Sequence, residues 1–352
     1  SRAGDYLLHS WLRVRIPSVT LLPNNLYGVD GRLHWTRNLM HHLVEKVSIT
    51  FNDLVAEQFE SNFLDFWAAF TVPASKRVGY DNMIGNLDPL QLSRAPGVAI
   101  PRRYLNLPLP LFFTRDSGVA LPTAALPYND MRINIKLRNW TELLELTNSV
   151  PTPAANITVP VVPRDIAAAP VLTDVQVWAN YAIVSNEERK RMGCAPRDLL
   201  VEQVQITPKL TFNPITTSNP HYDIRFSHAI KALFFGVTNT THPNVRGNYT
   251  TASPVPGPTV DNYKPALSVD PMDRISLIYE NTNRLGDMGA DYYSLVNPWY
   301  SAPTIPDITG YHLYSYSLTF YDIDPLGSTN YGKLTNVTIA PIVSSEAVVA
   351  AN

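Results

Sequence analysis

Met131-Arg-Ile-Asn-Ile-Lys-Leu-Arg138 decides the fold class, because apolar and polar residues alternate along this segment without interruption. Successive side chains of an extended strand point to opposite faces. Met131, Ile133, Ile135 and Leu137 would therefore share one face, and the polar residues would share the other. A strand with one dry and one wet face is typical of an antiparallel sheet, so the segment predicts an antiparallel β protein.

Period-two alternation recurs along most of the chain. In Val175–Ile183 every second residue is apolar, which predicts a strand with one buried face. Between His312 and Phe320, Tyr, Leu and Phe alternate with Ser and Thr. Shorter runs of the same kind predict further strands at Tyr6–Ile16, Leu43–Phe51, Leu199–Ile206, Ile224–Val237, Ile275–Tyr279 and Leu334–Ala340.

Helical patterns are few. Aromatic residues recur at a spacing of three to four from Phe59 to Phe70, and Pro73 follows them, so we expect one short helix there. Ser185 and Glu188 have the spacing of a capping box at the start of a second, polar helix. A capped polar helix between two strand-rich regions suits a linker between domains.

The composition limits the class of protein. The chain has 352 residues, enough for two domains, and 45% of them are hydrophobic, which argues against disorder. The net charge of −2 disfavours a nucleic-acid-binding surface, which needs an excess of Lys and Arg. A single cysteine, Cys194, excludes a disulfide framework and a cysteine zinc site. The 30 prolines disfavour long helices, and no apolar run is long enough to span a bilayer.

One internal echo suggests two related domains. Val44–Thr50 and Val201–Thr207 are identical at five of seven positions, at an offset of 157 residues. Many short strands, long connections and few helices point to sandwiches, with the jelly roll favoured. We therefore expect an all-β chain of two tandem antiparallel eight-stranded jelly rolls, with a few short helices in the loops and the linker. The expected N-terminal jelly roll covers residues 1–185, the helical linker 186–195 and the C-terminal jelly roll 196–352.

Two Pro-rich segments without periodicity are expected to be long loops, Asn148–Pro170 and Thr251–Pro265. Loops of this length in a compact β protein usually form functional surfaces. We expect both to serve surfaces or contacts between subunits rather than either core. We also expect the natural protein to extend beyond both ends, because Ser1 opens directly onto a strand pattern.

The best match to an enzyme motif is Gly327-Ser-Thr-Asn-Tyr-Gly-Lys333, which has the spacing of a phosphate-binding loop. The next residue of such a loop is Ser or Thr, which holds Mg²⁺, and the loop opens a helix. Here Leu334 follows, and the sequence after it alternates like a strand. We therefore favour a hairpin turn.

The histidines do not have the spacing of a metal site. Neither HxH nor HExxH occurs among the eight. His41 and His42 are adjacent, and in a strand they would face opposite ways, so we expect that they do not share a metal. The default is that the histidines are solvated or lie at the edge of a core.

Other reactive residue types also have simpler interpretations. Ser117 lacks the Gly-x-Ser-x-Gly elbow and is expected in a turn. Cys194 has no base near it in sequence, which predicts an inert thiol. Two pairs of acidic residues and five glycosylation sequons lie in turn-rich sequence; they are Asp287 with Asp291, Asp322 with Asp324, and the sequons at Asn139, Asn156, Asn239, Asn248 and Asn336. We expect no catalytic, cofactor-binding or metal-binding residue.

The segment Leu107-Pro-Leu-Pro-Leu-Phe-Phe-Thr-Arg-Asp-Ser-Gly-Val-Ala-Leu-Pro122 resembles the central signature of the major capsid proteins of nucleocytoplasmic large DNA viruses. The iridovirus branch fits best. Supporting matches extend over nearly the whole chain, at Trp35–Asn38, Val44–Asp53, Gly79–Asn86, Leu126–Asp130, Val201–Gln205, Arg225–Leu233, Tyr279–Leu285, Asp291–Tyr300, His312–Ser317 and Gly327–Gly332.

This resemblance implies two jelly rolls packed side by side and a structural protein without enzymatic activity. Three chains would form a capsomer of near-hexagonal outline, and capsomers would tile an icosahedral shell outside an internal viral membrane. The implied partners are the chain itself, neighbouring capsomers, and minor capsid and penton proteins, with no nucleic acid and no cofactor. The implied location is the virion, after assembly in the host cytoplasm. A charged fraction of 16% and 18 tyrosines suit a chain that buries large sides against its copies.

Two other classes of function are open from the sequence. A carbohydrate-binding β-sandwich would expose Trp at its loop tips, and Trp35, Trp140 and Trp299 are the candidates, although burial in a core or interface is favoured for each. A metal-dependent cupin enzyme would need a histidine spacing that the chain lacks.

Overall fold

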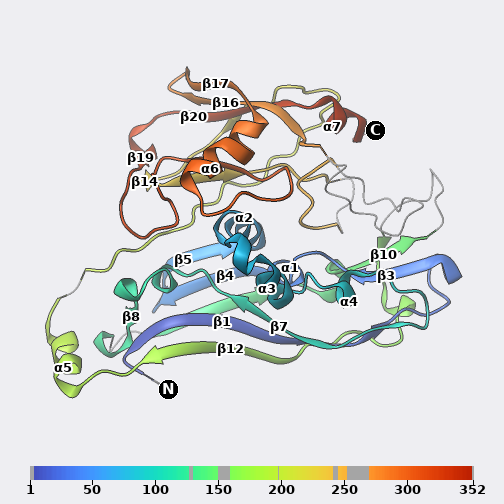
Figure 1. Cartoon of the computed structure of the whole chain (residues 1–352), viewed down its shortest axis with the longest axis horizontal. Helices are drawn as coiled ribbons and strands as arrows, with labels where there is room; N and C mark the ends of the chain where they lie inside the picture. The colour runs from blue at the N-terminus through green and yellow to red at the C-terminus, as the bar shows by residue number, and fades with distance from the viewer. Residues whose placement is uncertain are drawn as a thin grey trace.

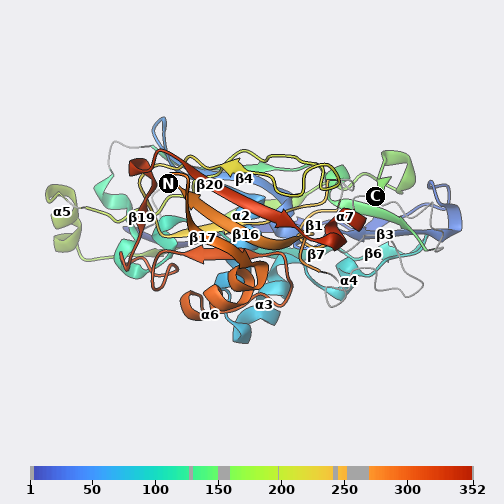
Figure 2. The same ribbon diagram turned by 90° about the horizontal axis from the view of Figure 1, so that it is seen from above.

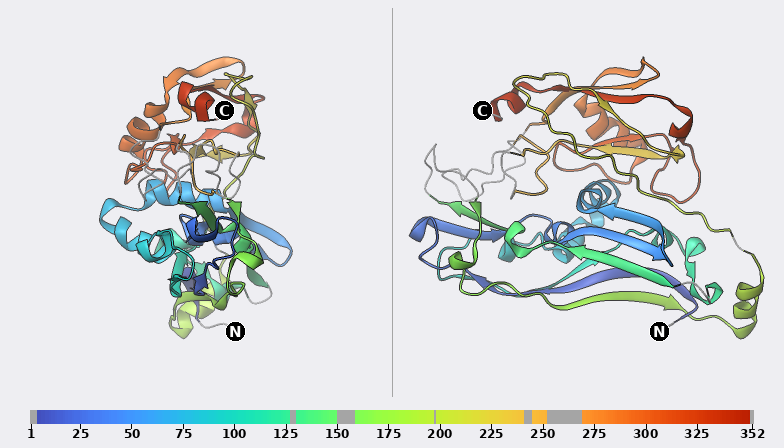
Figure 3. Two further views of the ribbon diagram at one scale, coloured as in Figure 1. Left: turned by 90° about the vertical axis from the view of Figure 1, so that its right-hand side faces the viewer. Right: turned by 180° about the vertical axis from the view of Figure 1, so that it is seen from behind.

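A computed structural model describes residues 4–126, 130–149, 159–196, 198–240, 245–251 and 269–350. The described residues form two β-rich halves, with the N-terminal half below and the C-terminal half above in Figure 1. Views from above and from the sides show that one half lies on top of the other, across the long axis of the molecule (Figures 2 and 3). The helix α2 (Ser61–Thr71) lies between them (Figure 1).

The N-terminal half is built from short antiparallel sheets. The path β12-β1-β7 carries β8 as an additional partner of β1, and the other groups are β5-β4-β9, β11-β10-β3 and β2-β6. The bounds are β1 Tyr6–Ile16, β2 Val19–Thr20, β3 Gly31–Trp35, β4 Val44–Phe51, β5 Leu54–Glu60, β6 Ala99–Ile100, β7 Arg103–Pro108, β8 Leu121–Pro122, β9 Met131–Leu137, β10 Leu144–Asn148, β11 Val159–Pro160 and β12 Thr173–Ala182. Its helices are α1 Leu39–Leu43, α2, α3 Ala74–Ile84 and α4 Asp88–Gln91.

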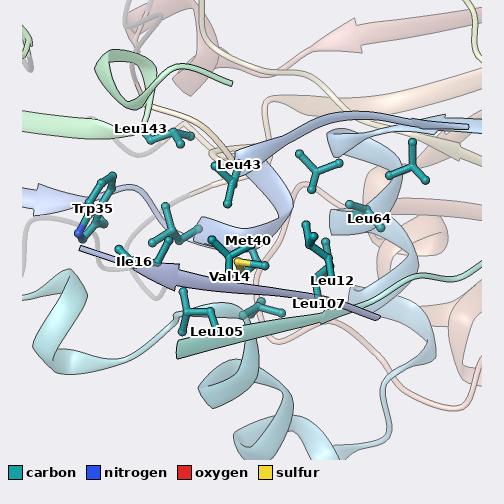
Figure 4. Packing of buried hydrophobic residues seen from close by; sticks show 14 of the residues in the cluster. Leu12, Val14, Ile16, Trp35, Met40, Leu43, Leu64, Leu105, Leu107 and Leu143 are labelled. Carbon is teal, nitrogen blue, oxygen red and sulfur yellow. The ribbon is translucent and has the colours of Figure 1, made fainter. Parts of the chain in front are cut away.

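The strands of this half follow the sequence pattern closely. β9 has the predicted bounds, and its exposed and half-buried residues alternate along its length. Ile133 of β9 is paired with Ile49 of β4, so apolar side chains meet across the ladder. In β1, Leu12 and Val14 point into a core that Met40 and Leu64 of the neighbouring helices complete (Figure 4). Each such burial contributes about 1.5–3 kcal/mol to folding.

The C-terminal half has one larger sheet, β13-β20-β16-β17, and two strand pairs, β14-β19 and β15-β18. Its core is separate from that of the N-terminal half and centres on Ile275, Leu277 and Tyr293. The bounds are β13 Tyr222–Asp223, β14 Ala229–Ile230, β15 Ala232–Phe235, β16 Met272–Tyr279, β17 Thr282–Gly289, β18 His312–Ser315, β19 Thr329–Asn330 and β20 Val337–Val343, with a π-helix at Tyr292–Val296 and helices α6 Asn297–Ser301 and α7 Ser345–Ala350.

The predicted polar helix is α5 (Asn186–Cys194), which lies at one end of the molecule (Figure 1). The side chain of Ser185 accepts a hydrogen bond from the backbone N–H of Glu188, as the predicted cap requires. Arg189 donates two hydrogen bonds to Asp5, of 2.8 and 2.9 Å, and these fix the helix against the start of β1.

Leu199–Ile206 was predicted as a strand, and the structure shows that this is wrong. The segment is irregular and joins no ladder within the described part of the chain. It crosses from α5 to the C-terminal half (Figure 1) and is held by side chains: Gln203 donates to the carbonyl of Ala56, and Gln205 bonds with Ser227. The echo between Val44–Thr50 and Val201–Thr207 therefore does not mark equivalent strands.

Four other strand predictions need correction. Leu334–Ala340 begins only at Val337, as β20, because Leu334 still caps the 3-10 turn Tyr331–Lys333. His228, with φ of +67°, interrupts Ile224–Val237, which forms only β14 and β15. β18 ends at Ser315, because the hydroxyl groups of Ser315 and Ser317 bond to carbonyls two residues further along. β12 forms at Thr173–Ala182, but its apolar side chains are exposed, 45% for Val175, which contradicts the predicted buried face; it is the end strand of its sheet.

The loop predictions lie partly outside the described residues. Residues 150–158 and 252–268, which include parts of the two predicted loops, lie outside the described residues. The described remainder of Asn148–Pro170 contradicts a purely surface role, because Val161 and Ile166 are buried in the N-terminal core. β11 also adds to β10 there. The Pro-rich composition predicted a surface loop, although two residues of this segment belong to the core.

Candidate functional site

The segment that has the spacing of a phosphate loop, Gly327–Lys333, is a connection between sheets. β19 pairs with β14, a single 3-10 turn follows at Tyr331–Lys333, and β20 then joins the larger sheet. The side chain of Asn330 accepts a hydrogen bond from the backbone N–H of Gly332, which closes the turn. No helix opens here, so phosphate would meet no helix N-terminus. The predicted turn is present, although it does not join the two strands of one hairpin.

His41 and His42 lie in α1, which corrects their predicted placement in a strand. Adjacent residues of a helix are about 100° apart, so both rings reach the same carboxylate, that of Asp65 on α2. His41 Nδ1 is 2.7 Å from Asp65 Oδ1, and His42 Nε2 is 3.4 Å from Oδ2. The default of solvated or edge histidines is also wrong for this pair, because both are fully buried.

Asp65 accepts hydrogen bonds from both halves of the molecule. Asn38 of the N-terminal half donates to Oδ1 over 2.9 Å, and the hydroxyl of Tyr249 of the C-terminal half donates to Oδ2 over 2.9 Å. Burial acts to raise the pKa of Asp65, but attraction to His42 when that ring is charged, together with the hydrogen bonds from His41 and Tyr249, outweighs burial and holds that pKa below its usual range. Asp65 is therefore a buried anion at the boundary between the halves.

In contrast to Asp65, which is charged, His42 is held in its neutral form. Burial lowers its pKa to about 4, although the carboxylate of Asp65 acts against this and favours the charged ring. Its Nε2 makes no hydrogen bond to any described residue. His42 is therefore neutral at neutral pH, and acidification would place a charge on a ring that burial keeps neutral.

Aromatic side chains form the rest of the boundary. Phe66 of α2 lies edge-to-face with Tyr249 and Tyr311, with ring centroids 5.0 and 5.1 Å apart. Phe70 stacks on Phe234 of β15. The backbone of the C-terminal half comes so close that a Cβ on Gly236 would lie 2.7 Å from the Phe66 ring. The aromatic spacing that predicted α2 from the sequence is thus the spacing of its contact face with the other half.

A cleft of about 1750 Å³ lies beside this boundary and is lined by residues of both halves. On its floor Glu57 of β5 is 3% exposed, and its Oε2 accepts a hydrogen bond from the backbone N–H of Phe112. Burial raises the pKa of Glu57 to about 7. The guanidinium of Arg115 lies 3.7 Å above the Trp67 ring, and its Nη2 is 3.7 Å from Glu202.

Side chains of opposite charge meet in this cleft. Lys231 reaches Glu202 as well, over 2.5 Å, so one carboxylate is shared by two cations. Trp67 covers one face of the Arg115 guanidinium. These side chains join α2 and Arg115 of the N-terminal half to the segment after α5 and to Lys231, which lies between β14 and β15 of the C-terminal half.

Tyrosines fill much of the interior of the C-terminal half. The hydroxyl groups of Tyr279, Tyr316 and Tyr331 bond to one another, and the Tyr316–Tyr331 pair is 2.6 Å apart. Burial and the neighbouring hydroxyls raise the pKa of Tyr316 and Tyr331 far above the usual value. Tyrosine was expected to serve contacts between subunits, and here a large share of it serves the core of one chain.

The remaining candidates have structural surroundings. Ser117 lies in a 3-10 turn that Asp116 closes by accepting from the N–H of Gly118. Asp287 accepts a hydrogen bond from Ser276, Asp322 one from Thr319, and Asp291 and Asp324 are exposed. Cys194 is exposed at the end of α5. Within the described ranges, no group of three or more His, Cys, Asp or Glu side chains could hold a metal ion.

The three tryptophan candidates for sugar binding are not together. Trp35 is buried, Trp140 packs against the N-terminal core, and Trp299 is 71% exposed on α6. The sequon at Asn248 is closed to a glycan, because Asn248 is buried and its amide oxygen accepts from Thr250. Asn156 lies outside the described residues. No helix in the described part of the chain is long and apolar enough to cross a membrane.

Solved structures with the same arrangement of strands are virus capsid proteins. A chain of the PBCV-1 virus capsid superposes with a TM-score of 0.74, covering 99% of this chain and 82% of that chain at 20% identity. The Faustovirus major capsid protein superposes with a TM-score of 0.68, covering 98% of this chain and 83% of that chain at 10% identity. The fold is therefore that of the double jelly roll capsid proteins.

The sequence comparisons narrow the class. The family model for the N-terminus of major capsid proteins matches residues 1–184, and that of the large eukaryotic DNA virus major capsid protein matches residues 188–352. The major capsid protein of Invertebrate iridescent virus 6 is 62% identical over 100% of this chain and 77% of its own length. That of Lymphocystis disease virus 1 is 52% identical over 99% and 76%. The chain belongs to the major capsid protein family of large eukaryotic DNA viruses, on its iridovirus branch.

Proposed function

We propose that three copies of this chain form a capsomer of near-hexagonal outline, and that such capsomers tile an icosahedral shell. Membership of the capsid family supports a role in self-assembly. The observation that supports a specific contact surface is a run of exposed apolar side chains on the π-helix and α6. Leu295, Val296, Trp299 and Tyr300 are 50%, 43%, 71% and 80% exposed. Aromatic residues of this kind are enriched where protein surfaces become buried.

The mass of the protein in solution tests this proposal. Light scattering on the purified chain is expected to give three copies per particle. The double substitution Trp299→Asp with Tyr300→Asp is expected to shift the protein to monomer, and Leu54→Asp, which changes another exposed apolar residue at the β4–β5 turn, is expected to leave the trimer intact. A folded wild-type monomer would refute the trimer, and a stable trimer of the double variant would refute this contact surface.

We propose further that the chain has no enzymatic activity and uses no cofactor or metal. The support is local: the residue types that carry chemistry elsewhere have packing or capping partners here, as with His41 and Asp65 and with Asp116 and Gly118. A carbohydrate-binding module is not favoured, because the exposed Trp299 is the only one of the three sequence candidates outside a core. Glycan-array binding by the trimer would be evidence against this view.

The finer assignments belong to the same proposal. We infer a division into an N-terminal jelly roll at 1–185, a linker at 186–195 and a C-terminal jelly roll at 196–352. The separate cores and the exposed position of α5 support this division. Neighbouring capsomers, minor capsid and penton proteins, an apposed internal membrane and assembly in the host cytoplasm follow from the family resemblance. Electron microscopy of native particles, with capsomers resolved, tests all but the last.

A further inference from the structure

A small cluster of buried polar side chains around Asp65 connects the two halves. Asp65, His41 and His42 come from the N-terminal half, and Tyr249 is the donor from the C-terminal half. All four side chains are buried, with at most 3% exposed for any of them. The carboxylate is thus a single acceptor that both halves share, at a place with little access to water.

The segment 245–251 rests directly on His42. Gly247 has φ of +72°, and a Cβ there would lie 2.8 Å from His42 Nε2. Two residues later, Tyr249 donates to the same carboxylate oxygen that lies 3.4 Å from that nitrogen. Any movement of the His42 ring toward Asp65 Oδ2, or entry of water beside it, therefore displaces the segment that covers it.

We propose that this cluster is an acid-sensitive latch, which holds segment 245–251 against α1 and α2 while His42 is neutral and releases it when His42 takes up a proton from solvent. The proposal does not depend on the trimer, because every group in it belongs to one chain.

The charges around the ring decide the direction of the response. Asp65 on α2 attracts a proton to His42, whereas His41 on α1, Arg138 after β9 and Arg246 of the covering segment oppose it. Arg246 is partly neutralised by its ion pair with Glu142 over 2.5 Å. Asp65 already accepts three hydrogen bonds, so a charged His42 finds its one nearby acceptor shared with Tyr249. Burial, His41 and the two arginines prevail, and protonation acts against the closed arrangement.

The size of the effect follows from linkage. The open form binds a proton with the ordinary His pKa of 6.5, and the closed form binds it near pH 4. Between these values the open form binds more protons, so opening becomes easier as the pH falls. At pH 5 the opening equilibrium is expected to increase on the order of 30-fold relative to pH 7.5.

Hydrogen–deuterium exchange on the whole 352-residue chain tests the latch, with rates corrected for the intrinsic effect of pH. Amides of 245–251 are expected to lose protection between pH 7.5 and pH 5, whereas those of β1 are expected to keep it. His42→Gln should abolish the change, and the matched control His221→Gln, at an exposed position, should retain it. Equal protection at both pH values in the wild type, or the wild-type response in His42→Gln, would overturn the proposal.

A second variant keeps the test decisive if His42→Gln does not fold. Tyr249→Phe preserves the ring and every titratable group of the cluster except the phenol, and it removes the hydrogen bond to Asp65. This variant is expected to increase the exchange rate of amides 245–251 already at pH 7.5. If Tyr249 served packing alone, the exchange rate would not change, because the ring is kept. Unchanged exchange at that pH would refute the latch.

Discussion

Replacing Glu57 with Gln is expected to stabilise the protein at alkaline pH and to have little effect in mild acid. Glu57 is buried on the floor of the cleft, where Oε2 accepts a backbone hydrogen bond and Oε1 has no partner among the described residues. Gln has the same shape, can accept the same hydrogen bond from Phe112, and carries no charge. The substitution therefore removes the buried charge and leaves the packing in place.

The magnitude follows from the two pKa values. The unfolded chain releases the Glu57 proton near pH 4.5, and the folded protein releases it near pH 7, because burial disfavours the carboxylate. Between these values the folded state binds more protons, so stability falls as the pH rises from 4.5 to 7 and remains low above it. At about 1.4 kcal/mol per pKa unit, the loss amounts to about 3 kcal/mol at pH 8. Glu57→Gln should recover most of it, since the attraction to Arg115 is already included in the folded-state pKa of about 7.

Urea unfolding at pH 8, 6.5 and 5 measures this difference. The gain in the free energy of unfolding for Glu57→Gln should be greatest at pH 8 and should disappear at pH 5. Glu187→Gln, on the exposed face of α5, is the control and should change little at any pH. A Glu57→Gln protein that is less stable than the wild type at pH 8 would show that Arg115 holds Glu57 as a favourable ion pair, which contradicts the argument.

The remaining predictions concern contacts between parts of the chain. Phe66→Ala is expected to lower the free energy of unfolding by about 3–5 kcal/mol, and calorimetry should then resolve separate transitions for the two halves. Gly310→Ala should prevent the C-terminal half from folding, since Gly310 has φ of +95° and a Cβ would collide with the carbonyl oxygen of Tyr249; soluble protein with native circular dichroism would contradict this. Arg189→Ala should increase hydrogen exchange in α5, because it removes both hydrogen bonds to Asp5; unchanged exchange would show that the cap alone holds the helix.

The sequence predicted the elements whose pattern is local. β9 and β1 have the predicted bounds, because their alternation reflects one core face and one wet face. The aromatic run also predicted α2, since its spacing matches a helical period. What the pattern could not show was the partner of that helix, because the residues that Phe66 meets lie near Tyr249 and Tyr311, far along the chain.

The candidate site around Asp65 was missed for a related reason. His41 and His42 lie between two strands, in the five-residue helix α1. A helix this short is a single turn, which periodicity cannot detect. The one available signal was the pair of adjacent histidines, which the strand assumption separated. Likewise, β12 has the alternation of a half-buried strand, but the position at the end of a sheet is set by pairing with β1, which sequence alone does not specify.

The shared boundary also sets an order of events during synthesis. Asp65 and Tyr249 are 184 residues apart. At about 5–20 residues per second, Tyr249 leaves the ribosome roughly 3–13 s after Ala182, the last residue of β12, when the N-terminal half is already complete. During that interval the aromatic face of α2, with Phe66 and Phe70, has no partner from the C-terminal half and exposes apolar surface. In a cell that makes many copies at once, this face is where nascent chains are expected to aggregate or to require a chaperone.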